Sequence, residues 1–360
     1  LLSYNLNGPA MILDYPLTGV GIGAFHTAYP LYFDANYPTP HIGYNITARP
    51  QRAHSDIIQA FVEQGIISGI LHIVMVVLAL VAGWKLTQPH ILKQVGLMPT
   101  FVLTGTVGLC VNALGDFPLQ MATAPQVLFV LFALLAGWRA LYTPVKTYGP
   151  NWKIPNFIHA PIWLLLFIGF AVSTFYITQD GLDRRTGAQH LKQAMIRNAM
   201  GVVDDQTLNL INASYEAYPY NARMHEFRGI IYSHYNGNLQ LSNQQRLEAL
   251  NLALKYDAYA PNHLINKSSL LHRLALEALN LNDQTTAQIY LKEIETDLLP
   301  KLKKVAPFTQ HTWNIEGLLM LRYNNLEAAR DAFFKAQQIK HDDDVSKQAL
   351  ATMGISMRRK

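Results

Sequence analysis

A short polar segment between residues 49 and 55 holds the side chains best suited to chemistry. Arg49, Arg52 and His54 lie within six positions, directly before a long apolar stretch. Guanidinium groups bind phosphate through paired hydrogen bonds, and histidine often serves as a general base near neutral pH. We therefore expect a site in which Arg49 and Arg52 bind a diphosphate and His54 moves a proton. A solvated cluster on the surface is the simpler alternative.

The residues after His54 predict a polar stripe on a helix that starts near Arg52. Ser55, Gln59 and Glu63 recur at four-residue spacing and so share one helix face. The positive end of that helix dipole would favour an anion beside the arginines. His54 and Glu63 are nine positions apart and fall on opposite faces. Glu63 is therefore expected to hold neighbouring helices rather than to orient His54.

Four apolar stretches are each long enough to cross a bilayer as a helix. They are Ile66–Trp84, Val95–Leu114, Pro125–Leu141 and Ala160–Ile177. Residues 1–180 contain only seven Lys or Arg, against 22 in residues 181–360. This contrast predicts an all-α chain in which polytopic transmembrane helices are followed by a soluble helical domain.

The domain boundaries and the topology follow from the same pattern. We expect a loop region with the reactive motif at 1–65, four transmembrane helices at 66–180 and a helical domain at 181–360. Five of the seven basic residues of the first half lie at the first and third connections between spans, which makes those connections cytoplasmic. Residues 1–65 and the helical domain then share the outer side, which is the periplasm in a Gram-negative cell. A net charge of +5 over 360 residues is too small to indicate nucleic-acid binding.

Two ionisable residues close to the spans, Glu63 and Asp116, could have a role in a site. Charged groups at membrane depth usually face a bundle interior or a wet cavity. The alternative is that both carboxylates sit in headgroup water. No group of His, Asp and Glu has the spacing of metal ligands, so no metal site and no cofactor are expected.

The C-terminal half contains a pattern typical of a tetratricopeptide repeat. Trp313, Gly317, Ala329, Phe333 and Ala336 fall at its spacings, with small residues where two helices approach. A weaker copy begins at Gly229 and Tyr232. Repeats of this kind usually bind peptides or proteins, and the alternative is an irregular helical bundle.

Residues 16–25 contain a Gly-x-Gly-x-Gly run, which invites a nucleotide-binding interpretation. The context argues against it, because no βαβ unit surrounds the run and the topology puts it outside the cytoplasm. A tight, closely packed turn at the membrane surface explains the glycines better.

Three segments together resemble the O-antigen ligase / O-antigen polymerase superfamily. Residues 16–25 are similar to its P-L-x-G-x-G-x-G-x-F segment, and His54-Ser55 followed by Glu63-Gln64-Gly65 resembles its H-[NS]-x7-E-x-G motif. Residues 116–119 resemble the D-F-P-L of the branch that glycosylates pilins and other proteins. Ser55 stands where Asn is commoner. The chain looks like the C-terminal part of such a protein.

The resemblance implies an integral-membrane glycosyltransferase of the bacterial inner membrane that needs no metal. It would transfer a preassembled oligosaccharide from undecaprenyl diphosphate to a hydroxyl of a periplasmic protein such as a pilin. The family's loop histidine maps onto His54, and its phosphate-binding arginines map less directly onto Arg49 and Arg52. Ser55, Gln59, Glu63, Gly65 and Asp116 would support the site.

Two alternative functions remain open on the sequence. Within the same class, the acceptor could be lipid A core or a growing O-antigen, since no residue here reports the acceptor. From a different class, the chain could be a non-enzymatic membrane scaffold that recruits envelope proteins through its repeat domain.

Overall fold

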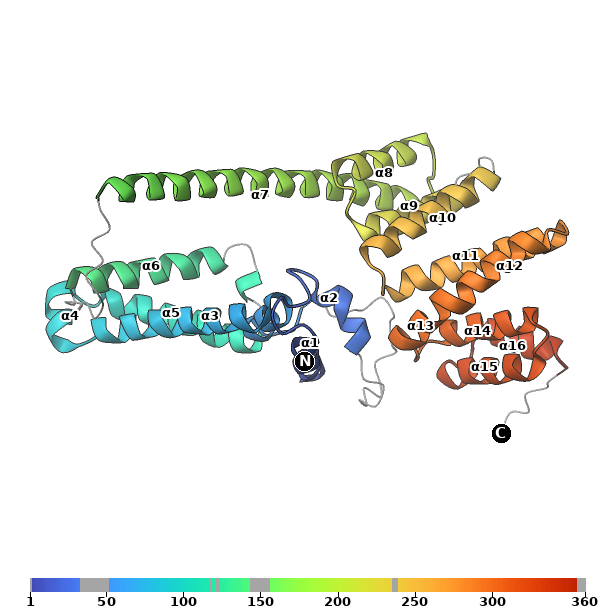
Figure 1. Cartoon of the computed structure of the whole chain (residues 1–360), viewed down its shortest axis with the longest axis horizontal. Coiled ribbons are helices and arrows are strands. Elements are labelled where there is room, and N and C mark those ends of the chain that lie inside the picture. Colours follow the sequence, from blue (N-terminus) through green and yellow to red (C-terminus); the bar gives the residue numbers. More distant parts are fainter. Residues whose placement is uncertain are drawn as a thin grey trace. The chain divides into compact units, whose positions relative to one another are not determined.

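The regular structure of the described residues is entirely helical. The computed structural model describes residues 2–32, 52–116, 118–120, 124–142, 156–234 and 239–354. Every regular element within these ranges is a helix (Figure 1). Two compact units make up the chain, Leu1–Gly149 and Pro150–Lys360. The all-α prediction is thus confirmed for this part of the chain, while Arg49 lies outside the described residues.

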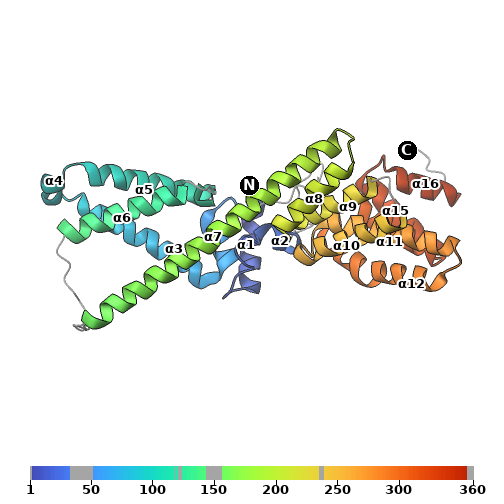
Figure 2. The ribbon, with the colours of Figure 1, turned by 90° about the horizontal axis from the view of Figure 1, so that it is seen from above.

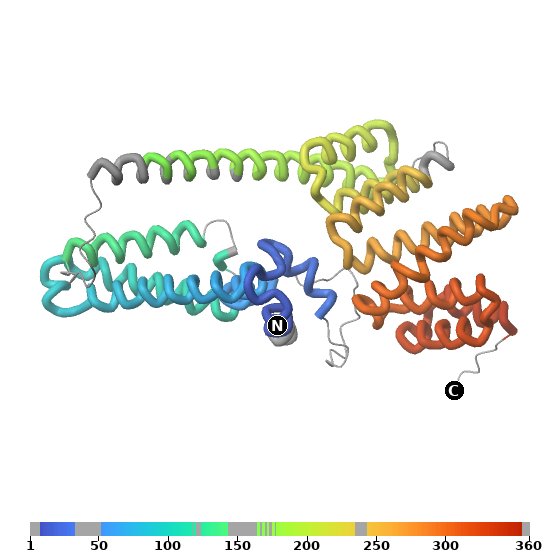
Figure 3. The backbone as a smooth tube through the Cα atoms, viewed as in Figure 1, coloured from blue at the N-terminus to red at the C-terminus, as the bar shows by residue number. Residues whose placement is uncertain are grey.

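The first unit is built around one long helix, α3. Its elements are α1 (Leu2–Asp14), α2 (Phe25–Ala28), η1 (Tyr29–Tyr32), α3 (Asp56–Leu86), α4 (Pro89–Val95), α5 (Met98–Gly115), η2 (Pro118–Gln120) and α6 (Ala124–Tyr142). The hydroxyl of Ser55 caps α3 by accepting from the Ile58 amide at 3.4 Å. Pro89 and Pro99 stand in the first turns of α4 and α5, where a missing N–H costs nothing. The tube in Figure 3 follows the chain from α3 through the short α4 into α5.

Helices α3, α5 and α6 pack along one another, as Figures 1 and 2 show from two directions. Among the described residues, these three are long and apolar enough to cross a membrane. Their outward side chains are apolar as well, including Leu71, Leu78, Phe101, Val111 and Phe129. Helices that are apolar on their exposed faces as well as their buried ones are suited to lipid. The first unit is therefore membrane-associated.

The predicted boundary at residue 180 falls inside a helix. The fourth predicted span and the start of the predicted soluble domain form one 44-residue helix, α7 (Asn156–Ala199), which belongs to the second unit. The composition changes near residue 180, but no helix terminator accompanies the change. Asp180 and Arg184 even form an ion pair at i,i+4 across it. In the described residues, α7 is not among the candidate membrane helices.

The second unit is a succession of packed helix pairs. Its remaining elements are α8 (Asp205–Ala217), α9 (Ala222–His234), α10 (Leu239–Tyr256), α11 (Pro261–Asn280), α12 (Gln284–Glu293), η3 (Ile294–Leu298), α13 (Leu299–Val305), α14 (Gln310–Arg322), α15 (Leu326–Ile339) and α16 (Asp344–Thr352). The pairs are α7 with α8, α9 with α10, α11 with α12, and α14 with α15. Each pair buries its apolar stripe against its partner and its neighbours.

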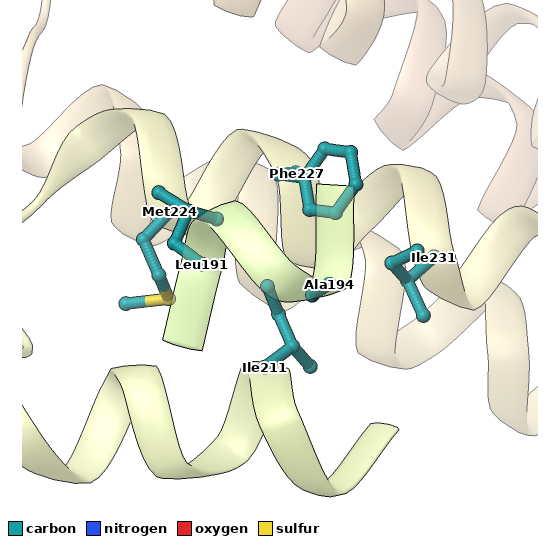
Figure 4. Close-up of a cluster of buried hydrophobic side chains, with 6 residues drawn as sticks. All are labelled: Leu191, Ala194, Ile211, Met224, Phe227 and Ile231. Atoms are coloured by element: carbon teal, nitrogen blue, oxygen red, sulfur yellow. The ribbon is translucent and has the colours of Figure 1, made fainter. Parts of the chain in front are cut away.

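A cluster of six buried side chains joins the end of α7 to α8 and α9 (Figure 4). Leu191 and Ala194 come from α7, Ile211 from α8, and Met224, Phe227 and Ile231 from α9. The C-terminal part of α7 is therefore part of the core of the second unit, which explains why the helix continues past residue 180.

Helices α14 and α15 form the tight pair that the glycine and aromatic pattern predicts. The ring of Phe333 is fully buried and covers Gly317 so closely that a β-carbon there would lie 2.6 Å from a ring carbon. Ala329 and Ala336 are also fully buried. The indole of Trp313 donates to the carbonyl of Pro307 at 2.8 Å. Small and large residues thus alternate across the contact, as close helix packing requires.

Candidate functional site

The glycine-rich segment fills a break in α3. Gly65 has φ +82° and ψ 175°, so the helix is interrupted there. The amides of Val20 and Gly21 donate to the carbonyls of Val62 and Glu63 at 2.8 and 3.0 Å, and the amide of Ile66 donates to Pro16 at 2.7 Å. These bonds replace the helical hydrogen bonds that the break removes.

Two glycines make this contact sterically feasible. A β-carbon on Gly65 would lie 2.3 Å from the carbonyl oxygen of Leu17, and one on Gly19 would lie 2.3 Å from the backbone of Glu63. Both residues also have positive φ. The glycines therefore serve backbone packing, and the amides of Val20 and Gly21 are already committed to carbonyls of α3. The predicted close packing of this turn is confirmed.

Glu63 ties the same segment to α3 through its carboxylate. Its Oε2 accepts from the Gly23 amide at 2.9 Å, and its Oε1 accepts from the Phe25 amide at 3.2 Å and from the Gln59 side chain at 2.9 Å. Glu63 is buried, and these charge-assisted bonds compensate the burial of its charge. Its partners are the loop and the start of α2, so it anchors the glycine segment.

The start of α3 is organised by the rest of the predicted polar stripe. Gln59 accepts from the Ala53 amide at 3.0 Å while donating to Glu63. Asp56 accepts from the Leu119 amide at 2.8 Å, which brings the connection after α5 over the start of α3. The helix begins at Asp56, four residues later than expected. Gln59 and Glu63 are thus joined by a side-chain hydrogen bond, while the Ser55 side chain caps the helix.

His54 and Asp116 approach each other across the top of α3 and α5. The Nδ1 atom of His54 lies 3.9 Å from Oδ1 of Asp116, and both side chains are partly exposed. His54 also has φ +53°, an unusual conformation for a residue with a β-carbon. Strain of this kind is retained where surrounding contacts fix it, often at functional sites.

A cavity of about 560 Å³ opens beside this hydrogen-bond chain. Its walls come from the end of the glycine segment, from α2, from α3 on both sides of the Gly65 break, and from η2: Ile22, Gly23, His26, Arg52, Asp56, Gln59, Ala60, Glu63, Gln64, His72 and Leu119. The volume falls in the range of small-molecule sites. These residues belong to three parts of the chain, 22–26, 52–72 and 119, that are far apart in the sequence.

The predicted site residues fall into two groups: some line the cavity, and others lie outside its wall. Arg52, Gln59 and Glu63 line the cavity, whereas His54 lies next to it, paired with Asp116. Ser55 and Gly65 shape α3, through its cap and its break. Arg49 lies outside the described residues.

Sequence reasoning missed two histidines in the cavity wall. His26 follows the glycine segment on α2, and its Nδ1 lies 3.1 Å from the carbonyl of Gly23. His72 stands in the apolar part of α3, and its Nδ1 lies 3.0 Å from the carbonyl of Ser68. The signal for His72 was available, because an ionisable residue within an apolar span is rarely placed there without a role. The placement of His26 depends on the docking of a distant loop.

Comparison with protein-family models and with curated proteins finds no match for this chain. The functional assignment therefore depends on the motif residues and on their arrangement around the cavity.

Proposed function

We propose that this chain is part of an O-oligosaccharyltransferase that moves a lipid-linked oligosaccharide onto a protein hydroxyl. One observation carries the proposal. The three segments that resemble the O-antigen ligase superfamily, 16–25, 54–65 and 116–119, are far apart in sequence but meet around one cavity at the end of an apolar helix bundle. If the three resemblances were unrelated coincidences, there would be no reason for the segments to meet around one cavity.

The chemistry assigned to the site is a single displacement at the anomeric carbon of the donor sugar. His54 accepts the proton of the acceptor hydroxyl, and Asp116 stabilises the resulting imidazolium. The acceptor oxygen bonds to the anomeric carbon while the bond to the diphosphate breaks, and the electron pair leaves with the diphosphate. Arg52 in the cavity wall balances the negative charge of that leaving group, together with Arg49 in the sequence just before it. The step requires no cofactor.

The membrane setting suits the proposed substrates. A polyprenyl diphosphate has its chain in the bilayer and its charged group at the surface, and the cavity lies at the α3 end that carries Asp56 and Arg52. We place this end in the periplasm and propose that the protein crosses the inner membrane four times, through α3, α5, α6 and the fourth predicted span, residues 160–177. Alkaline phosphatase fused after residue 185 should then be active and a fusion at Lys93 inactive. The reverse pattern would contradict this topology.

The second unit is proposed to be a tetratricopeptide-like domain that binds the protein acceptor. A repeated turn supports this assignment. In the α11–α12 and α14–α15 connections, an Asn with positive φ, Asn282 or Asn324, precedes the capping residue Asp283 or Asn325. In both, the capping residue's amide donates at 2.9 Å to a carbonyl five residues earlier. Two hairpins with the same turn chemistry are what a repeat produces.

The test is transfer of glycan to a protein acceptor by the purified full-length protein with a lipid-linked oligosaccharide donor. His54→Ala should lower turnover by about 10²–10⁴-fold without loss of membrane insertion. Arg49→Ala and Arg52→Ala should weaken use of the donor, and lysine at either position should restore it only in part. A chelator should have no effect. Wild-type turnover by His54→Ala would remove the catalytic assignment.

The same preparation separates the alternatives. Transfer to lipid A core, or extension of a glycan, in place of the protein acceptor would identify a ligase or polymerase. A membrane scaffold would show no transfer at all, and its cellular role would survive His54→Ala but not deletion of the second unit.

A further inference from the structure

We propose that His26 binds the diphosphate of the lipid donor, beside Arg52, in the cavity between α2 and α3. The inference rests on the proposed function and deepens it, because it assigns the leaving group to one wall of the site. No motif of the sequence analysis includes His26.

The ionisable residues of the cavity wall are the first observation behind this proposal. The wall contains two carboxylates, and both are occupied by donors of the protein itself. Asp56 accepts from the Leu119 amide, and Glu63 accepts from two amides and from Gln59. The other ionisable residues of the wall are Arg52, His26 and His72. Because both carboxylates already accept hydrogen bonds from the protein, an anion in the cavity would meet Arg52, His26 and His72 as its possible donors.

The hydrogen bond of His26 determines which of its nitrogens faces a ligand. A carbonyl oxygen only accepts, so the Nδ1 atom, 3.1 Å from the Gly23 carbonyl, carries a hydrogen. Nε2 is then the nitrogen left for a ligand in the cavity, and no hydrogen bond to Nε2 is found among the described residues. An imidazole with Nδ1 held in this way can add a proton at Nε2 and donate it to a phosphate oxygen.

The position of His26 is fixed by residues that the proposed site already uses. Glu63 holds the amides of Gly23 and Phe25, the residues on either side of Ala24, just before His26. Phe25 is fully buried in the cluster with Met11 and Val62. The imidazole is thus attached to a well-packed support, which lowers the entropy cost of binding. His54 stands outside the wall beside Asp116 and keeps the separate role of proton acceptor.

The experiment measures donor binding separately from transfer. The full-length protein in nanodiscs is titrated with the oligosaccharide diphosphate lipid, and undecaprenyl diphosphate, undecaprenyl monophosphate and inorganic diphosphate are used as competitors. The variants are His26→Ala, His26→Gln and His26→Lys. The matched control is His90→Ala, an exposed histidine on α4 beyond the other end of α3.

His26→Ala should raise the Kd of the donor and of both diphosphate competitors by about 10- to 100-fold, the range for losing one charge-assisted hydrogen bond. Lysine keeps a positive charge at this position and should recover most of that loss. Glutamine, which has no charge, should recover little. His90→Ala should bind like the wild type.

Three results would overturn the inference. One is a donor Kd for His26→Ala within about twofold of wild type. Another is a loss of donor binding with no loss for either diphosphate competitor, which would place His26 against the sugar. The third is a His26→Lys variant no better than His26→Ala. If the wild type binds diphosphate as described but transfers no glycan, the proposed function fails and the anion site stands. If it transfers glycan while His26→Ala binds normally, only this inference fails.

Discussion

The close contact between Gly317 and Phe333 allows a sharp test of the helix pair α14–α15. A β-carbon added at Gly317 would lie 2.6, 2.7 and 2.8 Å from three carbons of the Phe333 ring. These distances are shorter than real carbon contacts, so the ring or a helix must move. The ring is fully buried and packs beside Ala329 and Leu350, so it has little room to do so.

The expected free-energy change is the difference between two known effects. Alanine is favoured over glycine in a helix interior by about 1 kcal/mol. Overpacking a well-packed core costs about 1–3 kcal/mol. Gly317→Ala should therefore leave the domain less stable by up to about 2 kcal/mol. In α9, Gly229 provides a matched control, because a β-carbon there would meet its nearest atoms, in Arg246 and Leu250, at 3.7 Å, an ordinary contact. Gly229→Ala should stabilise by about 1 kcal/mol.

The two substitutions should thus shift the unfolding temperature of fragment 181–360 in opposite directions. For a domain of this size, 1 kcal/mol corresponds to about 2–4 °C. Trp313, the single tryptophan of the fragment, lies in α14 and reports on the local packing by fluorescence. Adding Phe333→Leu to Gly317→Ala should relieve part of the strain. If Gly317→Ala stabilises as much as Gly229→Ala, the close helix pair does not exist and the repeat assignment fails with it.

Two further predictions concern the anchor of the glycine segment and the pH stability of the second unit. Glu63→Ala removes the acceptor for the Gly23 and Phe25 amides, so the hydrogen exchange of these two amides should accelerate by about tenfold or more. Glu63→Gln should show a smaller effect. Equal protection of the amides in the wild type and both variants would contradict the anchoring role. Burial, with a smaller contribution from Arg322, lowers the pKa of His272 to about 4. Because this folded-state value lies below the unfolded one of about 6.5, the stability that His272 contributes is complete above pH 6.5 and decreases as pH falls toward 4. Fragment 181–360 should lose about 2 kcal/mol between pH 7 and pH 4.5 in urea unfolding, and His272→Gln should flatten this dependence.

Local sequence signals predicted the parts of the fold that depend on local physics. The apolar stretches of α3, α5 and α6 are visible because a membrane span needs about 20 apolar residues whatever its neighbours. The stripe of Ser55, Gln59 and Glu63 is visible because helix periodicity alone places the three on one face. The boundary at 180 was drawn from composition alone, and it falls inside α7. A helix ends where its hydrogen bonding is interrupted, and α7 continues until its residues Leu191 and Ala194 have packed against α8 and α9.

The break at Gly65 and the cavity beside it could not be predicted from spacing. A glycine within an apolar span is commonly tolerated in a continuous helix, so only its partner shows that the helix is interrupted. That partner, residues 16–21, lies more than 40 positions earlier in the chain. The cavity depends on two such long-range contacts, Gly23 with Glu63 and Asp56 with Leu119. Neither contact can be read from the periodicity of neighbouring residues.

These long-range contacts also explain why one carboxylate can determine the character of the site. Glu63 is needed to hold the loop that carries His26, and in doing so it commits both of its oxygens to donors of the protein. A buried carboxylate without such donors would repel an anion or take up a proton. Because its donors are backbone amides and an amide side chain, the charge is compensated without using Arg52 or either histidine as a hydrogen-bond donor. The same bonds that build the wall therefore occupy the oxygens of its buried glutamate, and this links the glycine segment to the proposed chemistry.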